Sequence, residues 1–365
     1  MFFDMNDLPE GLSTSEEVSL DELQLSQRNH GMQLEGLRYD VTPAGMHYLL
    51  IHFDVPEADE ASWRLAIGGL VRTPLEITMA DLRARPSVSM PVTMECAGNG
   101  RARLAPRPIS QPWLTEAIGT AEWTGTPMRG LLEEAGIGDE AVELVFRGAD
   151  HGIQGDVEQD YERSLWIGDA MREEVLLAYE MNGAPLPPQH GFPLRLVVPG
   201  WYGMTSVKWL TSITAVAEPF EGFQQLAYRY RQQPEDEGMP VTRMDPRSLM
   251  IPPGIPDFLT RSRMVDAGRH VLRGRAWSGW GLIERVEVSA DGGSTWETAA
   301  LGEAGSRHVW RSWSFDWDAQ PGTVELCCRA ADGAGKEQPL EPSWNLGGFS
   351  NNAVQRVSVE VRPRA

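Results

Sequence analysis

The segment from Pro91 to Arg101 places a cysteine where a strand ends in a loop of small residues. Residues 88–94 are β-branched and apolar, which predicts a short buried strand, and Cys96 is followed by Ala-Gly-Asn-Gly, which predicts a loop. A thiolate presented in this way suits a soft metal or a nucleophile, and Arg101 would favour the thiolate and attract an anionic substrate. The alternative is a half-buried structural cysteine beside a tight turn, the more common role of a lone cysteine.

A second group of polar residues surrounds a predicted buried strand at Leu194–Val198. His190, Arg195 and Lys208 bracket this strand, and the flanking turns are rich in glycine and proline. Positive and polarisable groups at these positions suit a phosphate. Each of these residues taken alone is more often part of a surface ion pair, so the phosphate prediction depends on all three together.

Composition limits the classes of function. The 365 residues are enough for two domains with hydrophobic cores, and a formal charge of −20 argues against binding to nucleic acid or to an anionic membrane surface. The three cysteines include the adjacent pair Cys327 and Cys328, which gives no disulfide framework and favours a reducing compartment. There is no signal-peptide pattern and no run of ~18 apolar residues. We therefore expect a cytoplasmic protein.

The first part of the chain predicts helices and strands in mixed order. Pro127–Gly136 has helical apolar spacing between a proline and a glycine, and a second helix is expected near Met79–Arg83. Val142–Asp150 predicts a strand that runs into a turn at the aspartate. Residues 1–25 are acidic and poor in periodicity, which predicts an arm that lies on the surface or on a partner subunit.

The last part of the chain predicts an all-β sandwich. Residues 232–256 are rich in proline and acidic side chains, which is typical of a linker. Six short alternating strands follow, separated by turns: Val271–Ala276, Ile283–Ser289, Thr295–Leu301, Trp310–Phe315, Val324–Ala330 and Val354–Val361. The predicted domains are 1–235 and 236–365. Ser289–Trp296 matches the Asp-box of sialidase propellers, but it occurs once, so a hairpin turn is the better interpretation.

The segment Glu95–Arg101 resembles the cysteine loop of the sulfite oxidase family of molybdenum enzymes. The resemblance extends over most of the chain, through Arg28–Gly31, Leu176–Gly183, His190–Gly200 and Trp344–Gly348. It implies an α+β protein, with a mixed α/β molybdopterin-binding domain followed by an immunoglobulin-like sandwich that forms a homodimer. It also implies that Cys96 is the single protein ligand to molybdenum, and that a pterin dithiolene supplies the other sulfurs.

The resemblance also assigns roles to individual residues. It implies a cofactor site formed by Arg28, Asn29, His30, Cys96, Asp150, His190, Arg195, Ser206, Val207 and Lys208. It implies a substrate site formed by Arg28, Arg101, Trp113, a tyrosine that is either Tyr228 or Tyr230, and Arg356. Many relatives have two consecutive arginines after Cys-Ala-Gly-Asn, whereas here the first of these positions is Gly100, so one positive charge is missing near the site.

The function implied by the resemblance is oxidation of sulfite to sulfate by oxygen-atom transfer. The sequence contains no Cys-x-x-Cys-His and no extra domain with haem-ligand histidines, so no haem is expected and electrons would pass to dioxygen or to a separate redox protein. Two alternatives remain: the same scaffold acting as a nitrate or sulfoxide reductase, and a binding protein that keeps the fold without the metal.

Overall fold

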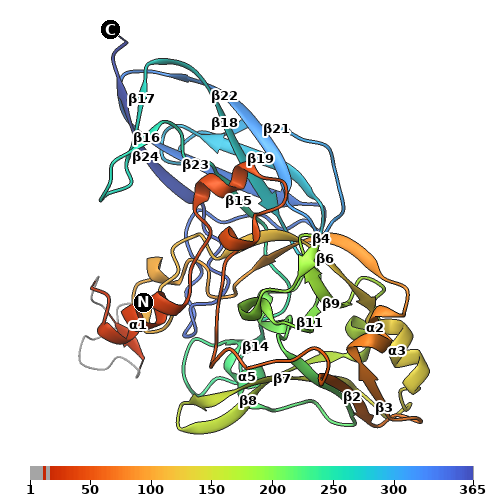
Figure 1. Ribbon diagram of the computed structural model, residues 1–365. Coiled ribbons are helices and arrows are strands. Elements are labelled where there is room, and N and C mark those ends of the chain that lie inside the picture. The colour runs from red at the N-terminus through yellow and green to blue at the C-terminus, as the bar shows by residue number, and fades with distance from the viewer. Residues whose placement is uncertain (1–10, 14–16, 365) are drawn as a thin grey trace.

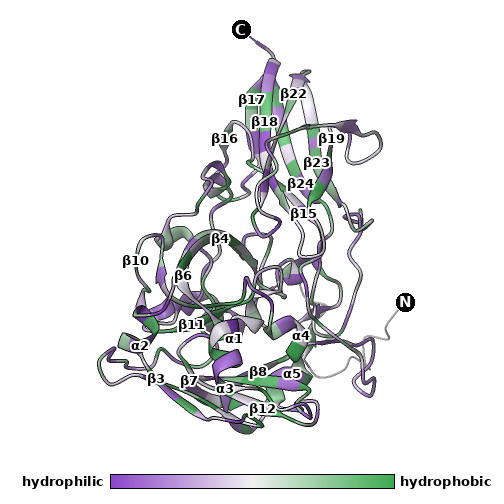
Figure 2. Ribbon diagram, turned by 90° about the vertical axis from the view of Figure 1, so that its right-hand side faces the viewer, coloured by the Kyte–Doolittle hydropathy of each residue, from purple (hydrophilic) through white to green (hydrophobic). Residues whose placement is uncertain are grey.

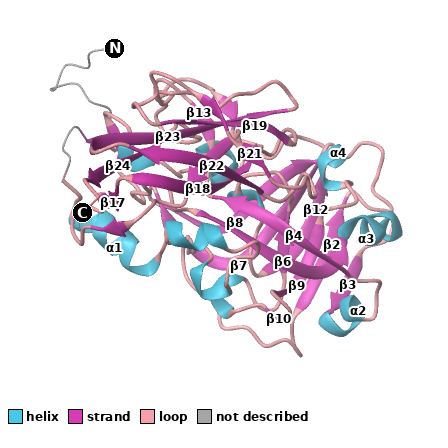
Figure 3. Ribbon diagram, turned by 90° about the horizontal axis from the view of Figure 1, so that it is seen from above, coloured by secondary structure: helices cyan, strands magenta, loops and turns pink. Residues whose placement is uncertain are grey.

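The chain folds into two lobes, both built mainly of strands (Figures 1 and 3). The computed structural model describes residues 11–13 and 17–364. The first lobe carries all five α-helices of the described residues, and the second is all β, which confirms the predicted order of a mixed domain and a β domain. The boundary predicted at residue 235 falls between β13 (Arg229–Tyr230) and β14 (Met239–Pro240), and its position stays a prediction. No helix in the described ranges is long and apolar enough to cross a membrane.

Two five-stranded sheets form the first lobe. In one, the order is β10-β9-β6-β4 with β11 also paired to β9; in the other it is β3-β2-β12-β7-β8. The strands of the first sheet are β4 (Val88–Glu95), β6 (Ile118–Pro127), β9 (Leu176–Met181), β10 (Ala184–Pro185) and β11 (Arg195–Val197). Those of the second are β2 (Arg64–Gly69), β3 (Leu75–Thr78), β7 (Glu143–Gln154), β8 (Val157–Trp166) and β12 (Leu210–Val216). A single buried apolar cluster joins side chains of both sheets.

The helices are short and lie at the edges of the sheets (Figure 3). They are α1 (Leu20–Arg28), α2 (Met79–Arg83), α3 (Met128–Ala135), α4 (Ile167–Ala170) and α5 (Phe223–Ala227). Helix α3 buries Met128, Leu131, Leu132 and Ala135, which share one face, and it ends at Gly136 with φ +67°. The predictions for α2 and α3 are therefore confirmed.

The expectation of an arm poor in periodicity over residues 1–25 is wrong where helix α1 begins. Ser19 caps this helix and forms a reciprocal capping box with Glu22, whose carboxylate is buried against Arg107. Two short strands, β1 (Leu12–Ser13) and β5 (Arg107–Pro108), pair nearby. Residues 1–10 and 14–16 of the predicted arm lie outside the described residues.

The turn expected at Asp150 is also wrong. Strand β7 continues to Gln154 and returns as β8 through Gly155 and Asp156, which both have positive φ. The pairing register shifts between Arg147 and His151, so Asp150 lies in a bulge. A bulge turns its side chains away from the regular alternation of the strand, which explains how this aspartate reaches a cavity.

The second lobe is a sandwich of two sheets. The four-stranded sheet contains β15 (Arg247–Met250), β18 (Gly268–Trp277), β21 (Ala300–Leu301) and β22 (Arg311–Ala319). The six-stranded sheet contains β16 (Ile255–Pro256), β17 (Arg263–Asp266), β19 (Ile283–Ser289), β20 (Glu297–Thr298), β23 (Gly322–Asp332) and β24 (Gln355–Arg362). Hydrophobic and hydrophilic residues alternate along these strands (Figure 2), and the inward-facing ones form one core. An immunoglobulin-like strand order stays a prediction.

The linker predicted at residues 232–256 is partly strand. Strand β15 lies within it, pairs with β18 and buries all four of its residues, including Leu249 and Met250. A third apolar cluster then joins the lobes, because Ala97 and Tyr202 of the first share it with Leu249 and Trp277 of the second. A buried apolar interface of this kind holds two domains in one relative position.

Candidate functional site

Cys96 is the first residue after strand β4, at the start of the predicted loop. Its backbone N–H donates to Ala117 O at 2.9 Å, and 7% of the residue is exposed. Gly100 of the same loop has φ +93°, and a Cβ atom there would lie 2.6 Å from Asn351 O. Any other side chain at this position would be strained and would collide with the second lobe, which explains the glycine.

Side chains from the second lobe hold the cysteine loop. The buried carboxylate of Glu95 forms an ion pair with Arg247 Nε at 3.0 Å and accepts a hydrogen bond from Trp277 Nε1 at 2.8 Å. Asn99 Nδ2 donates to the same carboxylate at 2.9 Å, and Asn351 Nδ2 donates to Gly100 O at 2.8 Å. The position of Cys96 therefore depends on contacts between both lobes.

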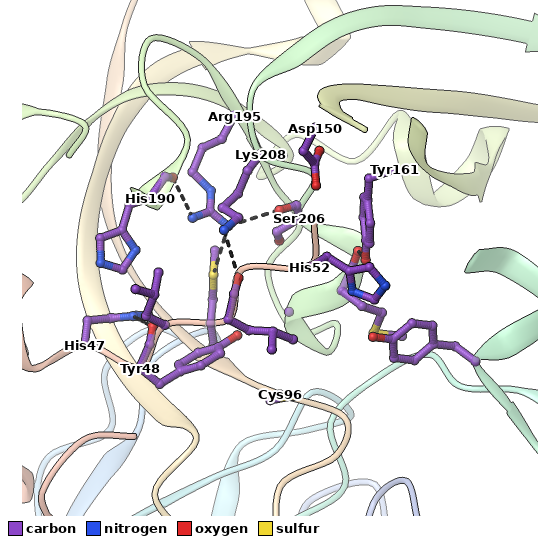
Figure 4. Close-up of a pocket in the computed structure, with 16 residues that line it drawn as sticks. His47, Tyr48, His52, Cys96, Asp150, Tyr161, His190, Arg195, Ser206 and Lys208 are labelled. Carbon is purple, nitrogen blue, oxygen red and sulfur yellow. Dashed lines mark hydrogen bonds between the residues drawn. The ribbon is translucent and has the colours of Figure 1, made fainter. Parts of the chain in front are cut away.

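An inner cavity opens beside Cys96 (Figure 4), and its empty space, which includes open solvent at the mouth, is about 670 Å³. In the figure, Asp150, Arg195, Ser206 and Lys208 lie on one side of this cavity, and Cys96 lies on the other. The lining residues are His47, Tyr48, Leu49, Leu50, His52, Met94, Cys96, Asp150, Tyr161, His190, Arg195, Gly203, Met204, Ser206, Lys208 and Tyr228. The structure thus brings six of the predicted cofactor residues to one cavity.

The two cations of the inner cavity have no ion-pair partner within the described residues. Arg195 donates to His190 O and Ser206 O, both at 3.0 Å, and its guanidinium lies over the ring of Trp123. Lys208 Nζ donates to Leu50 O at 2.8 Å and to Gln189 O at 3.1 Å. Burial and the neighbouring arginine lower the pKa of Lys208 to about 7. Two cations held by backbone carbonyls form a site that favours an anion.

Asp150 is the only carboxylate among the side chains described as lining this cavity. Its Oδ1 is buried without a hydrogen-bond partner, and burial raises the pKa of the carboxyl to about 6, opposed by the charge of Lys208. A buried oxygen of this kind is costly unless a ligand supplies a donor. It therefore indicates a ligand with N–H groups.

The histidines of the cavity are neutral. Burial lowers the pKa of His190 to about 2 and that of His47 to about 4, and the two rings lie edge to face with their centroids 5.6 Å apart. His47 Nε2 is buried and has no partner in the described structure. His190 therefore lines the site as a neutral hydrogen-bonding group. It was predicted together with Arg195 and Lys208 as one of three positive or polarisable groups.

An outer cleft meets the inner cavity at Cys96 and Tyr228, which line both. Arg28 and Arg101 line this cleft, as does Trp113, which packs against Cys96. Arg101 is buried, and its Nε donates to Gly347 O at 3.0 Å. Two predicted arginines are thus placed on the outer side of the cysteine, where an anion could approach.

The structure separates the two candidate tyrosines. Tyr228 is 9% exposed, stacks on Phe349 and lines both cavities, and burial raises its pKa to about 12. Tyr230 instead shares a 2.6 Å hydrogen bond with Ser350 Oγ and lines neither cavity. Tyr228 is therefore the candidate for contact with a substrate.

Four further predicted residues do not line the inner cavity or the outer cleft. Asn29 and His30 line a separate groove together with Arg356. Asn29 is buried and supports the chain through Ile51 N and Gln111, and Arg356 forms ion pairs with Glu325 and Glu341. Val207 is buried in the apolar core of the first lobe. The structure gives these residues supporting contacts and no place at Cys96.

Sequence reasoning missed four aromatic residues of the inner cavity: His47, Tyr48, His52 and Tyr161. The segment 47–52 has no regular strand or helix and no recognisable motif. The structural reason for Gly203 is the cavity's Tyr48, because a Cβ atom at residue 203 would lie 2.0 Å from the hydroxyl of Tyr48. A glycine that must leave room for a tyrosine is visible only once the two segments are placed together.

Comparisons with known proteins agree with this arrangement. Residues 52–224 match the family model described as "Oxidoreductase molybdopterin binding domain", and residues 240–362 match "Mo-co oxidoreductase dimerisation domain". Mitochondrial sulfite oxidase of Rattus norvegicus is 34% identical over 349 residues, which are 88% of this chain and 62% of that protein. Sulfite oxidase of Gallus gallus is 33% identical, over 87% of this chain and 72% of that protein.

Other similar proteins have names that state other activities. Nitrate reductase [NAD(P)H] of Hordeum vulgare is 32% identical over 88% of this chain and 39% of its own length. The solved structure of the sulfane dehydrogenase SoxCD from Paracoccus pantotrophus superimposes with a TM-score of 0.78 at 27% identity, over 99% of this chain and 93% of that one. The chain spans 62% of the length of the mammalian relatives that it matches.

Proposed function

Because this chain belongs to the sulfite oxidase family of molybdenum-cofactor oxidoreductases, we propose that it oxidises sulfite to sulfate and passes two electrons to an external acceptor. The observation that carries this proposal is the position of Cys96, which lines both the inner cavity, together with Asp150, Arg195 and Lys208, and the outer cleft, which contains two arginines. The cytoplasm is the proposed compartment, and the match to a dimerisation domain supports a homodimer.

The described residues fit a molybdopterin. Arg195 and Lys208 would hold its phosphate, because both are cations without an ion-pair partner. The unpartnered Oδ1 of Asp150 would accept from the amino-pyrimidine edge of the pterin. Cys96 would bind the metal through its thiolate, and since burial raises the pKa of this thiol, binding must displace its proton. No cluster of three or more His, Cys, Asp or Glu side chains elsewhere in the described chain could hold a metal.

The protein's own part in the reaction is binding, orientation and proton control. When bound, the molybdenum and its dithiolene supply oxygen-atom transfer and redox chemistry. Arg28 and Arg101 attract the sulfite dianion into the outer cleft and compensate its loss of water. Tyr228 keeps its proton at neutral pH, because its pKa is about 12, so its hydroxyl can donate to a sulfite oxygen at the meeting point of the cavities.

Steady-state kinetics test this proposal. Purified protein with stoichiometric molybdenum should oxidise sulfite in the presence of ferricyanide, cytochrome c or dioxygen, and the three acceptors compared in turn identify the class of acceptor. Nitrate and methionine sulfoxide are the alternative substrates, and turnover of either without turnover of sulfite would contradict the proposal. If protein purified from a host that makes the cofactor contains no molybdenum, the binding-protein alternative is favoured.

A further inference from the structure

The outer cleft contains more apolar surface than an inorganic oxyanion can use. Its empty space, which includes open solvent at the mouth, is about 1390 Å³, and the only charged side chains described as lining it are Arg28 and Arg101. Its apolar side chains are Leu25, Leu50, Ile51, Phe53, Pro108, Ile109, Trp113, Ile153, Ala227, Leu346 and Phe349. Sulfite has no apolar surface, so it gains nothing from these contacts.

The apolar side chains extend from the cysteine to the rim. Leu50 and Trp113 pack in the cluster that contains Cys96. At the rim, Ile109 is 45% exposed and Ile153 is 70% exposed, and both line the same cleft. A ligand that extends outward from the anion position could therefore contact apolar side chains between Cys96 and the rim, beside the polar side chains of His52, Ser110, Gln111, Gln154 and Gln224, which also line the cleft.

The charged groups of the cleft favour a ligand with an anionic head. Arg28 forms no ion pair with any described residue, and Arg101 donates to two backbone carbonyls and lies over the ring of Phe349, with no described carboxylate as its partner. No described carboxylate lines the cleft, so nothing in it would attract a cationic tail. An anionic head at the arginines and an uncharged apolar tail at the rim fit these surroundings together.

We propose that this site also oxidises organic sulfinates, R–SO₂⁻, in which R is an uncharged alkyl or aryl group. The inference rests on the proposed function, since it uses the same transfer of an oxygen atom to sulfur. The balance is R–SO₂⁻ + H₂O → R–SO₃⁻ + 2H⁺ + 2e⁻: one S–O bond forms, both O–H bonds of water break, and two equivalents of a one-electron acceptor take the electrons. The sulfur lone pair required for the step is present in a sulfinate as in sulfite.

The physical consequence is a dependence on chain length. Each methylene that leaves water for the cleft should raise kcat/KM about fourfold, until the tail passes the rim. Sulfonates, R–SO₃⁻, are products without a lone pair on sulfur and should bind with the same dependence. Their binding is therefore a readout that does not require turnover.

The experiment uses the molybdenum-loaded enzyme with methane-, butane- and hexanesulfinate and ferricyanide, and calorimetry with the corresponding sulfonates. The test variant is Ile109→Thr/Ile153→Thr, which keeps β-branched side chains and removes apolar surface at the rim. Val157→Thr is the matched control, because Val157 is 44% exposed on the same β7–β8 hairpin but does not line the cleft.

We expect kcat/KM and sulfonate affinity to rise with chain length in the wild type and in Val157→Thr, and to rise less in the double variant, with sulfite oxidation unchanged in all three. Sulfite turnover without sulfinate turnover, or a flat dependence on chain length, overturns this inference and leaves the proposed function standing. Sulfinate turnover without sulfite turnover overturns the proposed function and leaves this inference standing. If the chain-length dependence is the same in the double variant, the assigned apolar wall is wrong and the inference fails with it.

Discussion

Replacing Arg247 with methionine tests whether the second lobe holds the cysteine loop. Arg247 and Glu95 are both 1% exposed, and Arg247 Nε lies 3.0 Å from Glu95 Oε1. Methionine keeps an unbranched stem, although a shorter one, and removes the charge of arginine, so the buried carboxylate loses its cation. Breaking a buried pair in this way costs about 3–5 kcal/mol, because an uncompensated charge remains in the interior.

The expected result is a lower midpoint of thermal unfolding, by about 4–7 °C for that cost in a chain of this size. The double variant Glu95→Gln/Arg247→Met should recover part of the loss, because it removes both charges. Recovery will be incomplete, since Arg247 also donates to Asn351 O and Asn99 O. Calorimetry of the wild type, both single variants and the double variant gives the coupling energy of the pair.

The same variant should contain less molybdenum per chain, because Glu95 directly precedes Cys96. Elemental analysis measures this independently of stability. The reasoning is refuted if Arg247→Met unfolds at the wild-type temperature, or if the double variant loses the sum of the two single losses. Either result would mean that Glu95 does not depend on the second lobe for its charge compensation.

Three further predictions follow from the inner cavity. Lys208→Met should lower the molybdenum content about tenfold or more, the value of one charge-assisted hydrogen bond, and Lys336→Met should not, because Lys336 pairs with Asp245 outside the cavity. Without cofactor, the wild type should gain stability from pH 7 towards 10. Burial lowers the pKa of folded Lys208 from 10.5 to about 7, so between these pH values the unfolded chain binds a proton that the folded chain has lost. Denaturant titration should show that this gain is missing in Lys208→Met. Tyr228→Phe should lower kcat/KM for sulfite about ten- to a hundredfold at unchanged molybdenum content, and Tyr230→Phe should have little effect; equal effects of the two tyrosines would contradict the assignment.

The sequence predicted those helices and strands whose signals lie within one short segment. Helix α3 has its apolar face, its starting proline and its terminal glycine within one short segment, and strand β4 ends where small residues begin. Helix α1 carried an equally local signal, the capping box of Ser19 and Glu22, which composition had obscured. The sequence therefore contained the signal for helix α1, although the helix was not predicted.

The remaining features depend on segments that are far apart in sequence. The bulge at Asp150 is set by how β7 pairs with β8 and β12, and the hydrogen bond from Trp277 to Glu95 joins residues 182 positions apart. The predicted cluster of His190, Arg195 and Lys208 did meet in one cavity: Arg195 begins strand β11, His190 precedes it, and the hydrogen bond from Leu196 N to Val207 O places the segment of Lys208 beside it. Arg356 was carried over from a looser resemblance, and its neighbours Glu325 and Glu341 were not visible as partners in the sequence.

The most direct test of the central claim is X-ray absorption at the molybdenum edge of the purified protein. If the sulfur of Cys96 binds the metal, the wild type will show one more sulfur neighbour than Cys96→Ser, while the far-ultraviolet circular dichroism of the two proteins stays the same. Identical sulfur shells in the two proteins would show that the metal is bound without this cysteine and would contradict the account.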